Sequence, residues 1–159
     1  ERAENLMIVD LIRNDLSAVC EPSSVAVESL LAVRSYSTVH QLVSDVSGQL
    51  AEGASPLDAL RALFPGGSMT GAPKEKAMEI ISELESSQRD VYSGAIGYIT
   101  AGMEMELGMV IRTAVFDRDT VSIGIGGGIT SDSQPESEHE EIQLKAIALA
   151  SVLGARVRW

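Results

Sequence analysis

The chain has 159 residues, of which 45% are hydrophobic and 22% are charged, a balance typical of soluble globular proteins and not of disordered chains. Twelve Lys and Arg residues against 23 Asp and Glu residues give a formal net charge of -11. Duplex binding needs a basic surface that displaces counterions, so we expect no nucleic-acid partner. No apolar run approaches the roughly 18 residues of a membrane-spanning helix, so we expect no membrane partner. Cys20 is the one cysteine, which excludes an internal disulfide and indicates a reducing, cytoplasmic location.

The first half of the chain is predicted to alternate between helices and strands. Residues 4–16 carry apolar side chains over most of a helical surface, so we expect a helix that is buried on several sides. Residues 25–50 are rich in Val, Ser, Thr and Tyr, which predicts two or three strands. Ser55 before Pro56, with Asp58 three residues after the serine, predicts the capped start of a short helix.

The second half of the chain combines a glycine-rich loop, a set of strands and two helices. The loop covers residues 66–72, and Pro73 after it opens a helix with an apolar stripe. Three successive strands joined by short turns, and hence antiparallel, are predicted at residues 92–100, 104–116 and 120–126, before a last helix over residues 136–153. The sequence therefore predicts an α+β fold, largely antiparallel sheet with packed helices, as one domain or part of one.

Two pairs of glutamates share one spacing. Glu1 and Glu4 begin the first predicted helix, and Glu138 and Glu141 begin the last. Residues three apart lie on one helix face, so two facing pairs would form an oxygen-rich site for a hard cation such as Mg²⁺. Acidic residues are also common in first helical turns, where they complement the helix dipole. The spacing alone leaves both interpretations open.

Two basic residues are candidates for anion binding. Lys145 follows Glu141 by four positions, which favours either an exposed ion pair or a cation beside a carboxylate-bearing substrate. Arg112 lies in the predicted strand over residues 104–116, on one face with Val110 and Ala114. A buried arginine needs an anionic partner, so we expect a salt bridge or a ligand carboxylate.

His40 and two glycine-rich segments complete the candidates. His40 lies in a strand-like run and is either a hydrogen-bonded core residue or an acid–base group. The loop GGSMTGAPK over residues 66–74 places Ser68 just before a helix N-terminus, where anions are favoured. The glycines at 126–128 leave bare amide N–H groups that can approach a carboxylate, or form a plain turn.

Four strings of residues occur in order along the chain: AENLMIVDLIRND (3–15), FPGGSMTGAPKEKAMEIISELE (64–85), YSGAIGY (92–98) and GGGITSDSQPESEHEE (126–141). Together they resemble the chorismate-utilising enzymes, the family of anthranilate, aminodeoxychorismate, isochorismate and salicylate synthases. The resemblance implies that residues 1–159 are the C-terminal part of a single chorismate-binding catalytic domain with that family's fold. Because the chain begins at Glu1 without a methionine, we expect a piece of a longer protein.

The resemblance also implies roles for individual residues. It implies Mg²⁺ as cofactor, catalytic roles beside the substrate ring and the metal, and a set of groups that bind the substrate carboxylates. The metal ligands implied are Glu1, Glu4, Glu138 and Glu141; the catalytic residues are His40 and Lys145; the substrate-binding residues are Ser68, Tyr92, Arg112, Gly126, Gly127 and Gly128. One departure concerns the turn before Tyr92, where Arg89-Asp90-Val91 stands in place of the family's usual Arg-Gly.

The strings GGSMTGAPK and GGGITSDSQPE are similar to those of the aminodeoxychorismate synthase branch. This implies an enzyme that aminates chorismate to 4-amino-4-deoxychorismate, in para-aminobenzoate and folate biosynthesis, with ammonia from a glutamine amidotransferase subunit or fused domain. The alternatives are anthranilate formation with release of pyruvate, formation of isochorismate or salicylate with water, and a catalytically silent binding module. The resemblance further implies a nucleophilic lysine and a general-acid glutamate upstream of Glu1, so we expect this chain alone to be inactive.

Overall fold

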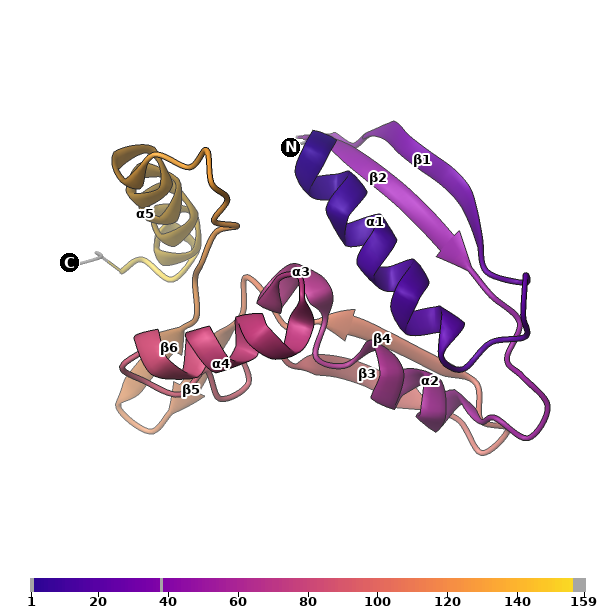
Figure 1. The fold of residues 1–159 in the computed structure, drawn as a ribbon. Helices are drawn as coiled ribbons and strands as arrows, with labels where there is room; N and C mark the ends of the chain where they lie inside the picture. The colour runs from indigo at the N-terminus through magenta and orange to yellow at the C-terminus, as the bar shows by residue number, and fades with distance from the viewer. Residues whose placement is uncertain (1, 38, 156–159) are drawn as a thin grey trace. The chain divides into compact units, whose positions relative to one another are not determined.

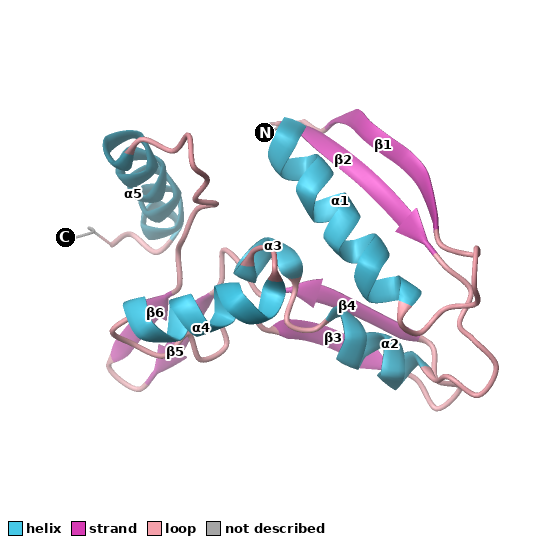
Figure 2. Cartoon of the chain, viewed as in Figure 1, coloured by secondary structure: helices cyan, strands magenta, loops and turns pink. Residues whose placement is uncertain are grey.

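The computed structural model of the chain describes residues 2–37 and 39–155. The fold class is α+β, as the sequence predicts (Figures 1 and 2). The glycine-rich loop predicted over residues 66–72 differs from the prediction, because it contains a short helix over Gly67–Thr70. The elements are α1 (Arg2–Ser17), β1 (Ala26–Ser35), β2 (His40–Ser47), α2 (Pro56–Leu63), α3 (Gly67–Thr70), α4 (Lys74–Leu84), β3 (Ala95–Ile99), β4 (Met105–Met109), β5 (Ala114–Asp117), β6 (Thr120–Ile123) and α5 (Pro135–Val152).

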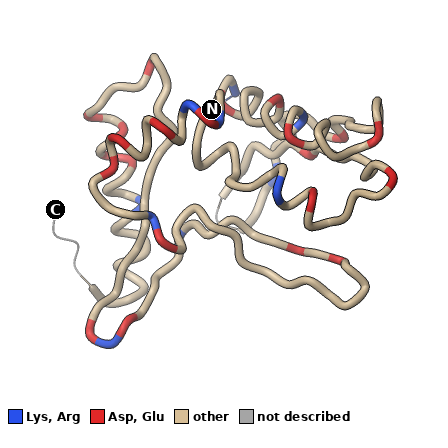
Figure 3. Tube along the Cα trace, turned by 60° about the horizontal axis from the view of Figure 1, so that its bottom comes forward, with Lys and Arg blue, Asp and Glu red and all other residues tan. Residues whose placement is uncertain are grey.

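The chain divides into two compact units. The first unit comprises Glu1–Ser86 and Gly97–Glu106, and the second comprises Ser87–Ile96 and Leu107–Trp159. Acidic residues are spread along the helices and loops of both units (Figure 3), in keeping with the net charge of -11. No helix in the described ranges combines the length and the apolar character that a membrane crossing requires. That both units belong to one catalytic domain stays a prediction.

In the first unit, helix α1 lies along the antiparallel pair β1–β2 (Figure 1). The register of the pair is interrupted between Val27 and Ala32, where Leu31 takes a positive φ of 53°. The Leu31 N–H donates to Ser44 Oγ at 2.9 Å, and the Ser44 hydroxyl donates to Asn5 Oδ1 of α1 at 2.6 Å. The bulge is therefore held to the helix by a chain of hydrogen bonds.

Helix α1 is less buried than its composition predicts. Val9 is the buried side chain of this helix, whereas Leu6 and Met7 are exposed. The expectation of burial on several sides is wrong for the described chain, because the β1–β2 pair, α2 and α3 cover only part of the helical surface.

Helix α2 begins with the capping box that the sequence predicts. The Ser55 hydroxyl accepts from the Asp58 N–H at 3.3 Å, and an Asp58 carboxylate oxygen accepts from the Ser55 N–H at 2.9 Å. The Ser55 hydroxyl in turn donates to Asp58 Oδ2 at 2.6 Å. This bond, the bond from the Ser55 N–H and the nearby Arg61 guanidinium lower the pKa of Asp58 below its usual value. Both ends of the box therefore satisfy backbone N–H groups that the first helical turn leaves unpaired.

The strands after residue 86 form two short antiparallel hairpins rather than one continuous meander. Strand β3 pairs with β4, and β5 pairs with β6 from Ala114↔Ile123 to Asp117↔Thr120. The predicted strand over residues 104–116 is interrupted between Met109 and Ala114. Arg112, in this interruption, has a φ of 51°, a left-handed conformation that does not continue a strand. The prediction that Arg112 alternates within a strand is therefore wrong.

Candidate active site

The segment that follows β6 lies against the ring of Tyr92. A Cβ atom built on Gly124 would lie 2.2 Å from Tyr92 Cγ, and one built on Gly126 would lie 2.8 Å from Tyr92 Oη. Distances this short exclude any side chain at these two positions unless the ring moves. The glycines predicted as a carboxylate-binding segment therefore also form the surface on which Tyr92 rests.

Helix α5 supplies the other charged groups of this site. The Lys145 ammonium donates to the carbonyl oxygen of Gly126 at 3.1 Å and pairs with Glu141 Oε1 at 2.6 Å. Glu138 Oε2 would be 3.4 Å from a Cβ on Gly127, an ordinary contact distance. The structure thus brings together five residues that the sequence singled out separately, all in the second unit: Tyr92, Gly126, Glu138, Glu141 and Lys145.

The glycine segment ends in residues that are open to solvent. Gly127 and Gly128 are exposed, whereas Gly126 is half-buried. Exposed backbone amides without side chains can approach an anion closely. The geometry of this end of the segment is compatible with carboxylate binding.

The turn before Tyr92 contains Arg89-Asp90-Val91 in place of the family's usual Arg-Gly, and its backbone takes a left-handed conformation at Asp90. Asp90 has a φ of 50° and Ser93 a φ of 68°; aspartate tolerates this left-handed region better than most residues. The Arg89 guanidinium carbon is 5.9 Å from the centroid of the Tyr92 ring, and Arg89 donates to Ser93 Oγ at 3.2 Å. Ser93 is buried, and its N–H donates to Val110 O at 3.0 Å. The Tyr92 ring is thus contacted by Arg89 as well as by the glycine backbone.

Arg112 is exposed between β4 and β5. Within the described ranges the structure gives its guanidinium no hydrogen-bond or ion-pair partner. The structural salt bridge that the sequence left open is therefore not formed among these residues. An exposed guanidinium on a backbone with a fixed left-handed residue can accept an anionic ligand at little desolvation cost.

The remaining candidates lie in the first unit. His40 begins β2 and is exposed, and its Nδ1 lies 2.9 Å from the hydroxyl of Ser35, its cross-strand partner. The expectation of a core histidine is therefore wrong, and an acid–base role stays a prediction. Ser68 lies in the short helix α3 and is exposed, so its hydroxyl is open to a ligand.

The four-glutamate metal site stays a prediction. Glu1 lies outside the described residues, and Glu4 belongs to the first unit whereas Glu138 and Glu141 belong to the second. Across residues 2–37 and 39–155, no three His, Cys, Asp or Glu side chains gather closely enough to hold a metal ion. Carboxylate oxygens are nevertheless the donors that Mg²⁺ prefers, and Glu138 is half-buried beside Gly127, where a side chain would contact its carboxylate. The carboxylates of Glu4, Glu138 and Glu141 therefore fit Mg²⁺ by their donor chemistry.

Sequence reasoning missed one ion pair. Lys74 Nζ lies 2.6 Å from Asp15 Oδ2, and the two residues are 59 positions apart. Both belong to strings that carry the resemblance, but neither spacing nor residue type connects them.

Comparison with known proteins identifies the family of the chain. Residues 1–151 match the family described as chorismate binding enzyme. The chain is 51% identical over 153 residues to the probable aminodeoxychorismate synthase, chloroplastic, of Oryza sativa subsp. japonica, covering 96% of this chain and 17% of the relative. It is 49% identical to anthranilate synthase component 1 of Aquifex aeolicus, covering 96% of this chain and 31% of that relative.

A solved structure of an anthranilate synthase has a similar fold. Anthranilate synthase component I from Streptococcus pneumoniae TIGR4 superposes with a TM-score of 0.86 at 40% identity, covering 92% of this chain and 34% of that one. The chain therefore spans between about a sixth and a third of the length of these relatives. From residue 1 to residue 151 the match to the family is continuous, and the chain belongs to the chorismate-binding enzymes.

Proposed function

We propose that the protein that carries this chain aminates chorismate to 4-amino-4-deoxychorismate. In this reaction the C4–O bond of the ring breaks, a C4–N bond forms with ammonia, and the hydroxyl leaves as water. The observation that carries the proposal is the group formed by Tyr92, the glycine segment and Lys145, in a chain 51% identical to an aminodeoxychorismate synthase from rice.

The substrate determines what the site must do. Chorismate carries two carboxylates, and the chain has a formal net charge of -11, so the charge must be inverted locally for the substrate to bind. Arg112 and the exposed amides of Gly127 and Gly128 would bind one carboxylate, with the Tyr92 hydroxyl as a further donor. Tyr92 is suited to this role because the glycine backbone and Arg89 fix its ring.

Mg²⁺ would be held by Glu1, Glu4, Glu138 and Glu141, directly or through water, because this cation gives up its hydration shell reluctantly. When bound, the metal supplies positive charge to the second carboxylate. Lys145 keeps the Glu141 carboxylate in place through their ion pair and ties α5 to the carbonyl of Gly126. His40 and Ser68 would contact the ring side of the substrate.

The ammonia would come from a glutamine amidotransferase subunit or fused domain, and the place of action would be the cytoplasm.

A second function within the family is favoured by the similarity of the chain to an anthranilate synthase. Anthranilate synthase component 1 of Aquifex aeolicus is 49% identical, nearly as similar as the relatives named for aminodeoxychorismate. The conversion of chorismate to anthranilate and pyruvate is therefore the alternative.

The reaction can be tested with the full gene product, chorismate, Mg²⁺ and ammonium, with the products separated by chromatography and identified by mass. We expect 4-amino-4-deoxychorismate. Anthranilate together with pyruvate would replace this proposal by the alternative. Unchanged chorismate, under conditions in which a known aminodeoxychorismate synthase is active, would refute both.

A further inference from the structure

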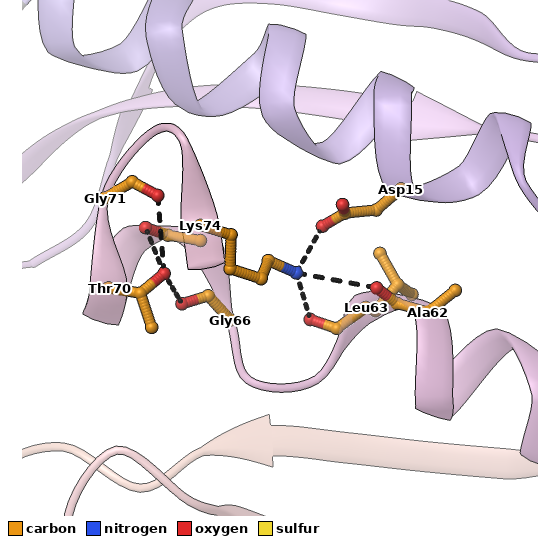
Figure 4. Close-up of polar contacts among 8 residues, drawn as sticks. Asp15, Ala62, Leu63, Gly66, Thr70, Gly71 and Lys74 are labelled. Carbon is orange, nitrogen blue, oxygen red and sulfur yellow. Dashed lines mark hydrogen bonds and ion pairs between the residues drawn. The ribbon is translucent and has the colours of Figure 1, made fainter. Parts of the chain in front are cut away.

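Helix α1 contacts the glycine loop at both of the loop's ends. Leu11 and Asp15 are four residues apart on this helix, which places them on one face. A Cβ on Gly67 would lie 2.2 Å from Leu11 Cδ2, so the first end of the loop is packed directly against Leu11. At the other end, Lys74 Nζ pairs with Asp15 Oδ2 at 2.6 Å (Figure 4).

The pair between Lys74 and Asp15 is largely removed from solvent. Their side chains are 16% and 11% exposed, whereas the ion pair of Lys76 with Glu79 on the same helix α4 is 65% and 62% exposed. A pair with so little exposure is screened weakly, and removing one partner leaves a poorly solvated charge. The Lys74–Asp15 pair therefore holds α1 and the start of α4 together more strongly than a surface pair would.

Lys74 also reaches the end of helix α2. Its ammonium lies 3.4 Å from Leu63 O and 3.5 Å from Ala62 O (Figure 4). These carbonyls belong to the last turn of α2, where a cation is favoured by the helix dipole and by unpaired acceptors. One ammonium group thus joins three helices at the point where the loop returns to α4.

Between these two attachments the loop closes on itself. The Thr70 hydroxyl is within 3.4 Å of the carbonyl oxygens of Gly66 and Gly67 and 3.5 Å from that of Gly71 (Figure 4). Thr70 therefore faces the inside of the loop, and Ser68 is left exposed. The path of the loop, and with it the position of the Ser68 hydroxyl, depends on where its two ends are attached.

We propose that the Asp15–Lys74 pair is a positioning device that sets the place of Ser68 relative to α1, the helix that carries Glu4. This rests on the proposed function, because it takes Ser68 as a contact of chorismate and Glu4 as a metal ligand. Neither Asp15 nor Lys74 touches the substrate in this proposal. Their effect passes through the loop.

The test uses the full gene product and compares three variants with the wild type. Lys74→Met removes the cation, the double variant Asp15→Asn with Lys74→Gln replaces the ion pair by neutral groups of similar size, and Lys74→Arg keeps the charge. Lys76→Met is the matched control, since it removes an exposed lysine of the same helix from an exposed pair. The measurements are kcat and KM for chorismate, far-UV circular dichroism, and hydrogen exchange of the amides of residues 66–72.

We expect the KM for chorismate to rise about 10-fold in the double variant and kcat/KM to fall by up to about 100-fold, since small displacements of a positioning group have effects of this size. The loop amides should exchange at least about tenfold faster, which is a shift of about 1.4 kcal/mol in their opening equilibrium. Lys74→Arg should keep the KM for chorismate close to that of the wild type. Lys76→Met should have the same KM and the same loop exchange rates as the wild type.

Two results would overturn the proposal. The first is a folded double variant whose loop amides exchange at the wild-type rate. The second is a loss of kcat in proportion to the unfolded fraction with an unchanged KM, which would show a purely structural role.

If Lys74→Met does not fold, the double variant decides, because it leaves no lone buried charge. If the wild type does not turn over chorismate, the proposed function fails, whereas the exchange rates still decide whether the pair holds the loop.

Discussion

The ring of Tyr92 lies on the backbone of Gly124 so closely that a Cβ on this glycine would be 2.2 Å from Tyr92 Cγ. The contact joins the turn before β3 to the segment after β6, two parts of the second unit that are far apart in the sequence. Position 124 therefore requires glycine because a side chain would collide with the Tyr92 ring, and not because of its backbone conformation.

Replacing Gly124 by alanine should displace the Tyr92 ring. A methyl group that meets a ring carbon at this distance forces the side chain or the backbone to shift, which typically lowers stability by about 1–3 kcal/mol. Because Tyr92 is proposed to bind a substrate carboxylate, the KM for chorismate should also rise. Gly108→Ala is the control, since its Cβ would meet no atom nearer than Ile96 O at 3.9 Å. Equal stability of the two variants would contradict the contact.

Arg112→Gly should lower activity without lowering stability. Glycine adopts the φ of 51° at this position without strain, so the fold gains if anything, while the substrate loses a charged partner. A hydrogen bond to a charged group typically contributes about 1.5–3 kcal/mol, and kcat/KM for chorismate should fall accordingly. Arg118→Gly is the control, because Arg118 is also exposed and has a φ of 47° but lies in the β5–β6 turn. A wild-type kcat/KM in Arg112→Gly would remove Arg112 from the site.

The expected magnesium ligands can be tested on α5. Glu138→Gln and Glu141→Gln each replace an anionic oxygen donor by a neutral one, so the Mg²⁺ concentration at half-maximal activity should rise strongly in both. Glu140→Gln changes the charge equally on the same helix and should leave the magnesium requirement unchanged. Glu141→Gln also removes the ion pair of Lys145, so its kcat should fall further than that of Glu138→Gln. An unaltered magnesium dependence in both variants would exclude these residues as ligands.

The capping box of α2 should make stability depend on acid pH. Because hydrogen bonds from Ser55 lower the pKa of Asp58 below 3.8 in the folded protein, folding favours its ionised form. This contribution is fully present above the unfolded pKa and is lost as the pH falls below 3.8 through the folded pKa. The melting temperatures of wild type and Asp58→Asn should therefore differ at neutral pH and converge in strong acid. A constant difference across this range would show that the carboxylate charge is not involved.

Much of the fold follows from patterns that the sequence displays. Helices were predictable where a cap or an apolar stripe marks them, as at Ser55. The break at Arg112 was not, because apolar residues typical of strands stand on both sides of it and no glycine or proline occurs between Met109 and Ala114. The exposure of one side of α1 could not be predicted either, since periodicity shows which residues are apolar but not which of them other elements cover.

The candidate site was predictable only in part. Tyr92 was singled out by family resemblance, whereas Lys145 and the glycines were candidates from spacing and composition alone. The structure adds the contacts between them. The Asp15–Lys74 pair could not be found, because its members are 59 positions apart. Asp15 lies in the last turn of α1 and Lys74 at the start of α4, so each charge opposes the dipole of its own helix, but this does not show that the two residues pair. Pairings of this kind depend on how helices pack, which a single sequence does not show.

The 159-residue chain by itself should self-associate and should not turn over chorismate. Large apolar side chains stand open on its strands, with Val33 69%, Ile96 71% and Phe116 67% exposed. Two-stranded sheets with exposed edges and apolar faces pair readily with other chains. Because we expect the nucleophilic lysine and the general acid from the family resemblance and not from these residues, the chemical step should be missing even in a folded chain. Sedimentation velocity over a wide concentration range should show oligomers, and incubation with chorismate, ammonium and Mg²⁺ should leave the substrate unchanged. A monomeric chain that forms 4-amino-4-deoxychorismate or anthranilate would show instead that the residues described here carry the reaction themselves.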